Sequence, residues 1–272
     1  MEKKKCASCH HTTFFVWVKD LALQSGHKLD KDLLKEQRTW LIDSLLKERK
    51  PDPKKPDSVK PGELIGDKNI EGVSQLLVSP VAEHIPEKSK RQLVNIITSN
   101  QSESGNWKPG GQLPRQERPE KETQFTTNQW ALLAAGGALE SAAEIGKTSD
   151  SNVSTEWFAM RVILDPEDET SVKALLDRQN KDGGWSWKDG EPSCPMGTGQ
   201  SLLALSKCKT SVDLSKAMHR GRSYLTDTQD AEGHWETLST KDREETTEVS
   251  NFWGTAWAVI GLLESQPKID GQ

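Results

Sequence analysis

The sequence predicts an all-helical fold, an α/α toroid built from repeated helical hairpins. Two observations predict it: a Gln-Gly-Trp signature that recurs three times, and an apolar helix that follows each copy. The signatures read QSESGNW, QNKDGGW and QDAEGHW, at residues 101–107, 179–185 and 229–235. In each copy Gly follows Gln by four positions and Trp follows by six. Such self-similarity indicates that one structural unit is repeated along the chain.

Each unit is predicted to contain an outer helix, a turn and an inner helix. Residues 171–179 and 215–229 predict amphipathic outer helices, because apolar side chains recur on one face only. The signature Gly supplies a positive-φ turn after the helix, and the signature Trp is expected to be buried. A polar loop then leads to an apolar helix, which we expect to open at Thr127, Thr198 or Thr255. Buried helices ringed by amphipathic ones make an α/α toroid.

The remaining chain fits the same scheme. An apolar helix is expected from Thr13 and a charged amphipathic one after it. A generic helical solenoid is the alternative architecture. We predict one toroid domain over residues 1–272, with a Pro/Lys-rich loop at 47–70, helical stretches broken near Pro80 and Pro86, and the repeats across 73–266.

Composition excludes several classes of function. The net charge of -5 and pI of about 5.8 argue against nucleic-acid binding, which needs a basic face. The Lys-rich residues 47–60 are interpreted as a solvated linker, because prolines and no aromatic residues lie among the charges. No run of about 18 apolar residues predicts a membrane span.

Residues Cys6-Ala-Ser-Cys9-His10 form a CxxCH motif, which is typical of covalent c-type haem attachment. The two thiols would add to the haem vinyl groups, and His10 would bind the iron from the proximal side. We therefore predict haem c as the cofactor, held by a segment spanning residues 1–12. Phe14, Phe15 and Trp17 follow at once and are expected to offer flat apolar surface.

Two other readings of this motif stay open. The two cysteines with His10 and His11 offer ligands that zinc accepts, although four ligands within six residues would be strained. In the second reading, the CxxC pair is a redox site or occurs by chance.

The sequence does not identify the sixth iron ligand. Met196 is predicted to lie on a loop, where a thioether ligand would raise the reduction potential. Its alternative role is to fill a cavity, and an open iron site is equally compatible. His234 is the second candidate, with an exposed turn histidine as its alternative. Weaker or undecided candidates are His11, His27, His84, Met218 and His219.

The repeat signatures resemble the QW repeats of squalene-hopene cyclases and the related prenyltransferase α/α barrels, over roughly residues 70–266. The most specific parts are QNKDGGW, TGQSLLAL and WGTAWAVIGLL. Combined with CxxCH, the chain is similar to planctomycete-type secreted proteins that join a cytochrome motif to such repeats. The resemblance implies the toroid fold and an extracytoplasmic location.

The catalytic residues of those families are not found. The only near match to the cyclase DxDD acid is Asp165-Pro-Glu-Asp168, which we interpret as an acidic helix cap. Prenyltransferase zinc needs Asp, Cys and His, but only Cys194 matches, and Gly254 stands where the His is expected. Cys194 is therefore predicted to be an inert packed thiol.

The expected function is that of a periplasmic or secreted c-type haem protein in electron transfer, with an unidentified redox partner. A haem enzyme or gas sensor with an open iron is a second hypothesis. A terpenoid- or lipid-binding barrel without haem, holding a small apolar ligand, is the third. No signal peptide precedes Cys6, so we expect an upstream segment outside this chain.

Overall fold

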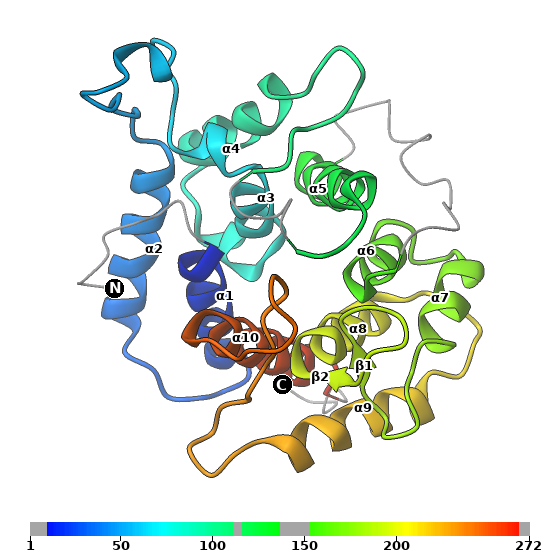
Figure 1. The fold of residues 1–272 in the computed structure, drawn as a ribbon. Helices are drawn as coiled ribbons and strands as arrows, with labels where there is room; N and C mark the ends of the chain where they lie inside the picture. Colours follow the sequence, from blue (N-terminus) through cyan, green and yellow to red (C-terminus); the bar gives the residue numbers. More distant parts are fainter. Residues whose placement is uncertain (1–9, 111–115, 137–152, 267–272) are drawn as a thin grey trace. The chain divides into compact units, whose positions relative to one another are not determined.

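The structure, a computed structural model, describes residues 10–110, 116–136 and 153–266. In these ranges ten α-helices and a single two-stranded sheet are found, so the all-helical prediction is confirmed (Figure 1). The described residues form two compact units. Unit 1 holds residues 10–110 and 130–136, and unit 2 holds residues 116–129 and 153–266.

Unit 1 contains two successive helical hairpins. Helix α1 packs on α2 and α3, and α3 packs on α4. The break predicted near Pro80 and Pro86 is confirmed, because a short 3-10 helix over Pro80–His84 separates α3 from α4. Helix α3 starts inside the predicted loop, since the Asn69 side chain caps it by accepting a bond from the Gly72 amide. The helices are α1 (His10–Gln24), α2 (Lys31–Leu45), α3 (Ile70–Val78) and α4 (Glu87–Ser99).

Unit 2 is organised around one helix that is buried along most of its length. Helix α8 packs between α6 and α10, and every residue from Pro195 to Leu205 is buried. Helices α7 and α9 are amphipathic and bury only a few positions each. The elements are the first part of α5 (Glu120–Ala135), α6 (Thr155–Leu164), α7 (Glu169–Leu176), β1 (Trp185–Ser186), β2 (Ser193–Cys194), α8 (Pro195–Lys207), α9 (Ser215–Thr228) and α10 (Glu248–Glu264).

Glycines set how closely α8 and α10 approach each other. A Cβ placed on Gly199 would lie 2.0 Å from the Trp257 carbonyl oxygen, and one on Gly261 would lie 2.6 Å from the Gly199 Cα. A methyl group at either position cannot fit without moving a helix backbone. The glycines of these two apolar helices therefore allow the helix backbones to come into contact.

The three signature turns have the same hydrogen bonds. Each Trp indole N–H donates to the carbonyl ten residues earlier, at 2.7 Å for Trp107, 2.8 Å for Trp185 and 2.8 Å for Trp235. Each signature Gln side chain donates to the carbonyl of the signature Gly. Those glycines have φ of 79°, 96° and 86° in chain order. The indoles are at most 1% exposed, so the predicted equivalence and burial of the three Trp are confirmed.

The predicted start of the inner helices was wrong by several residues. Helix α8 begins at Pro195 because Cys194 caps it, and α10 begins at Glu248 after a capping box at Thr247. The Thr residues have another role: Thr198 Oγ1 accepts the Trp185 amide at 2.9 Å, and Thr255 Oγ1 accepts the Trp235 amide at 3.1 Å. In the second and third copies, therefore, the threonine ties the signature turn to the inner helix.

Candidate functional site

The predicted haem-attachment residues lie at the edge of the described chain. Cys6 and Cys9 fall outside the described residues. His10 is the first residue of α1, and its side chain lies outside them too. The motif therefore runs directly into a helix, as its sequence predicts, while the ligand geometry stays a prediction.

Two of the three aromatic residues that follow the motif pack within unit 1. Phe14 and Trp17 stack with their ring centroids 5.9 Å apart, and the Trp130 ring meets Trp17 edge-on at 6.5 Å. Phe14 and Trp17 are 1% and 2% exposed. Phe15 is half-buried, with the Lys19 ammonium 4.1 Å from its ring centroid. Of the three residues, only Phe15 thus retains surface for a flat cofactor, because the Phe14 and Trp17 rings are buried in the core of unit 1.

Met196 lies in the first turn of α8 rather than on the predicted loop. The loop prediction was wrong because Pro195 suits the first helical position and the Cys194 side chain caps the helix. Met196 is 2% exposed. Its thioether is thus packed within unit 2, and its role as a sixth ligand stays a prediction.

The Cys194 thiol is buried, and its pKa is raised. Burial raises its pKa to about 11, against the weaker opposing effect of the Gly197 amide, which donates to the sulfur at 3.4 Å. Burial also raises the pKa of Cys208 to about 11. Thiolates are the nucleophilic and metal-binding form, so the raised pKa disfavours the reactive form of both cysteines near neutral pH. Within the described ranges, no three His, Cys, Asp or Glu side chains are grouped as metal ligands.

The other polar candidates have structural partners. His234 Nδ1 lies 2.7 Å from an Asp230 carboxylate oxygen, and the His234 side chain is 41% exposed. His84 lies 4.0 Å from the carboxylate of Asp20. Asp168 is the N-cap of α7, which agrees with its interpretation as a helix cap.

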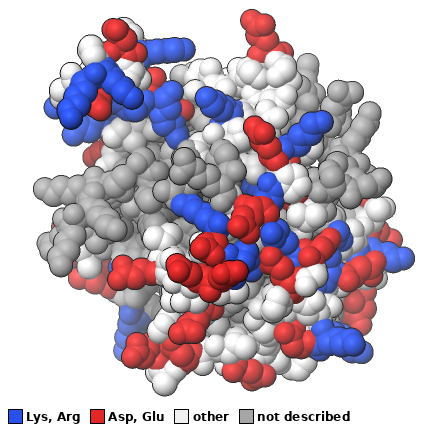
Figure 2. All heavy atoms as spheres, viewed as in Figure 1, with Lys and Arg blue, Asp and Glu red and all other residues white. Residues whose placement is uncertain are grey.

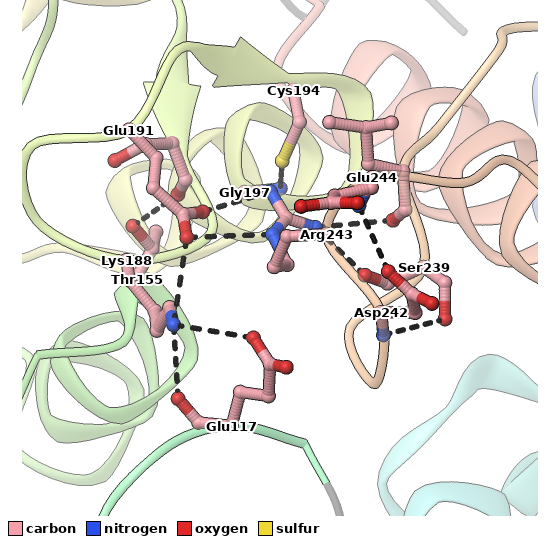
Figure 3. Close-up of polar contacts among 12 residues, drawn as sticks. Glu117, Thr155, Lys188, Glu191, Cys194, Gly197, Ser239, Asp242, Arg243 and Glu244 are labelled. Carbon is pink, nitrogen blue, oxygen red and sulfur yellow. Dashed lines mark hydrogen bonds and ion pairs between the residues drawn. The ribbon is translucent and has the colours of Figure 1, made fainter.

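A polar network joins three loops of unit 2, as Figure 3 shows. Arg243 donates to the Glu191 carboxylate at 2.8 Å, and also to the carbonyl oxygens of Leu238 and Ser239. Glu191 lies 3.5 Å from the Lys188 ammonium, which donates to the Glu117 carbonyl at 3.0 Å. The loop of the β1–β2 hairpin is therefore joined to the Arg243 loop through Glu191 and to the Glu117 loop through Lys188.

Beside this network lies a cavity of about 310 Å³. Cys194, Tyr224 and Arg243 are among the residues that line this cavity. Thr237 also lines it, is 3% exposed, and has a hydroxyl with no hydrogen-bond partner among the described residues. No described base hydrogen-bonds the Cys194 thiol, and Glu191 compensates the Arg243 charge. The cavity has the size of a small-molecule site.

No pattern in the sequence indicated this network or cavity. Glu191 and Arg243 are 52 positions apart, and neither belongs to a recognisable motif. Paired substitutions in related sequences are the one signal that could have found them.

No protein-family model matches the chain, and no curated protein shows significant similarity to it.

Within the described residues, no helix combines the length and apolar character needed to cross a bilayer.

Proposed function

We propose that this protein is a periplasmic or secreted c-type haem protein on a cyclase-like helical-repeat scaffold, acting in electron transfer. The observation that carries the proposal is the motif Cys6-Ala-Ser-Cys9-His10, whose last residue begins helix α1. The two thiols would form thioether bonds to haem c, and His10 would bind its iron. The redox partner is a separate protein.

We also propose that the helical hairpins close into an α/α toroid. The equivalent Trp turns, and an inner helix α8 packed between α6 and α10, support it. A closed 272-residue domain should have a radius of gyration of about 19 Å. Small-angle scattering that gives a clearly larger value would favour an open solenoid.

The haem proposal is tested by expression in a bacterial periplasm with the cytochrome c maturation system. We expect a pyridine haemochrome spectrum of c type, and haem that stays attached after denaturation. Replacing both Cys6 and Cys9 by Ala should abolish the attachment, whereas Cys194→Ala, the matched control, should leave it intact. A wild-type chain matured without covalent haem would refute the proposal and leave the haem-free barrel as the better hypothesis.

The sixth ligand is tested in the same material. If Met196 binds the iron, ferric protein should show the weak red absorption band of Met-ligated haem, and Met196→Ala should remove it. Carbon monoxide added to reduced protein separates the two haem hypotheses, because a six-coordinate electron carrier should resist binding and an open site should not. If the wild type lacks the red band, Met196 is packing alone.

A further inference from the structure

Residues 47–65 form an ordered projection between α2 and α3, which we call the lysine finger. Its base is closed by backbone bonds, from the Arg49 amide to the Glu63 carbonyl at 2.8 Å and from the Ile65 amide to the Lys47 carbonyl at 2.9 Å. The Arg49 guanidinium also pairs with the Glu63 carboxylate. The solvated segment predicted from the composition is therefore held as a shaped, hairpin-like loop.

The tip of the finger is stiffened as well. The Lys55 amide donates to the Asp52 carbonyl at 2.8 Å, and the Ser58 amide donates to the Lys55 carbonyl at 3.0 Å, so two turns follow each other. Prolines fix the backbone φ angle and remove amide donors. A long ordered loop of this kind is uncommon in compact domains and usually functional. The prolines are Pro51, Pro53, Pro56 and Pro61.

The finger carries positive charge on a negatively charged chain. Residues 47–65 contain six cationic and four acidic side chains, a net of +2, whereas the whole chain has -5. Figure 2 shows blue side chains gathered over this loop, at the upper left of the view. An isolated cationic projection on an anionic protein steers an anionic partner to one place. The exposed cations are Lys47, Lys50, Lys54, Lys55 and Lys60.

We propose that the lysine finger docks onto an acidic face of a partner protein. Acidic residues Glu48, Asp52 and Asp57 alternate with the lysines, and this mixed pattern matches a protein surface. A nucleic acid or an anionic bilayer presents uniform negative charge that would repel them. The exposed large apolar side chains in the described ranges all lie outside the finger. The finger therefore has no such side chain to insert into a lipid bilayer. The inference is independent of haem.

The clamp at the base gives the docking its specificity. A preformed loop loses less conformational entropy when it binds than a flexible one, so more of its electrostatic attraction becomes affinity. Glu63 is the residue that holds this shape, because its carboxylate pairs with Arg49 and lies 3.5 Å from the Lys68 ammonium.

The first test uses a fluorescein-labelled peptide of alternating Glu, Asp and Ser as probe. Fluorescence anisotropy should show saturable binding at about 20 mM salt that weakens at about 150 mM, because exposed charges are screened. The triple change Lys50→Gln, Lys54→Gln and Lys55→Gln should weaken binding at least about fivefold. The control removes three exposed lysines from unit 2, and an equal loss there would overturn the proposal. Its positions are Lys173, Lys181 and Lys216.

The second test separates shape from charge. Glu63→Gln makes the chain more positive, so charge alone predicts tighter peptide binding, whereas loss of the clamp predicts weaker binding. We expect weaker binding, and tighter binding would overturn the docking role of the shaped loop. Vesicles containing phosphatidylglycerol and a duplex DNA are titrated alongside the peptide. Finger-dependent binding to either that is tighter than binding to the peptide would also overturn it.

Discussion

Replacing Trp185 by Ala tests the repeat architecture most directly. The indole is fully buried among residues of α6, α7 and α8, and its N–H donates to the Leu175 carbonyl at 2.8 Å. A buried Trp removes about 150–250 Å² from water. At about 25 cal/mol per Å² this gives about 4–6 kcal/mol.

Two corrections act on that figure. Structure remaining in the unfolded chain reduces it by roughly 10–40%, and loss of the indole hydrogen bond adds about 1 kcal/mol. We therefore expect Trp185→Ala to lower the free energy of unfolding by about 4 kcal/mol, within the range for buried aromatic residues. Trp185→Phe keeps most of the ring volume and should cost about 1–2 kcal/mol, mainly through the lost N–H bond.

The assay is urea denaturation followed by far-ultraviolet circular dichroism, because removing a Trp changes the fluorescence signal itself. Trp40→Ala is the matched control, since Trp40 is 36% exposed on α2, and it should cost less than about 1 kcal/mol. Trp235→Ala should resemble Trp185→Ala, because both indoles make the same bond. A Trp185→Ala cost no larger than that of the control would refute the reasoning.

Three further predictions follow from other contacts. Gly199→Ala should destabilise the protein by at least about 2 kcal/mol in the same assay, because the new methyl group meets the Trp257 carbonyl; an unchanged denaturation midpoint would contradict the backbone contact. The Ser171 hydroxyl, which donates to Asp168, holds the pKa of Asp168 below its ordinary value of 3.8. The charged Asp168 therefore stabilises the fold above that pH and loses its contribution as the pH falls through its folded pKa. The stability lost in Asp168→Asn should thus be full at about pH 6 and shrink at about pH 3; a loss independent of pH would exclude the charge. With a raised pKa of about 11, the Cys194 thiol should resist maleimide labelling at about pH 7.5 until the chain is unfolded, as read by peptide mass spectrometry; rapid labelling of folded protein would show that the burial is wrong.

The features that the sequence predicted correctly depend on short separations. A Gly four residues after Gln supplies the turn, and the indole of a Trp two residues later reaches a carbonyl only ten positions back. Such contacts form within one hairpin, so their spacing is readable in the chain itself. The CxxCH motif at Cys6, Cys9 and His10 is also read from local spacing, and its role in haem attachment stays a prediction.

Other features were decided only by the tertiary structure. Met196 was expected on a loop, but capping by Cys194 moved the helix start and buried the thioether. The ion pair between Glu191 and Arg243 spans 52 positions, and no local pattern reports it. Composition indicated that residues 47–60 are a solvated linker, but it could not show that the ion pair between Arg49 and Glu63 gives this loop its shape. Periodicity determines which faces of a helix are apolar, but which distant groups meet depends on how the helices pack.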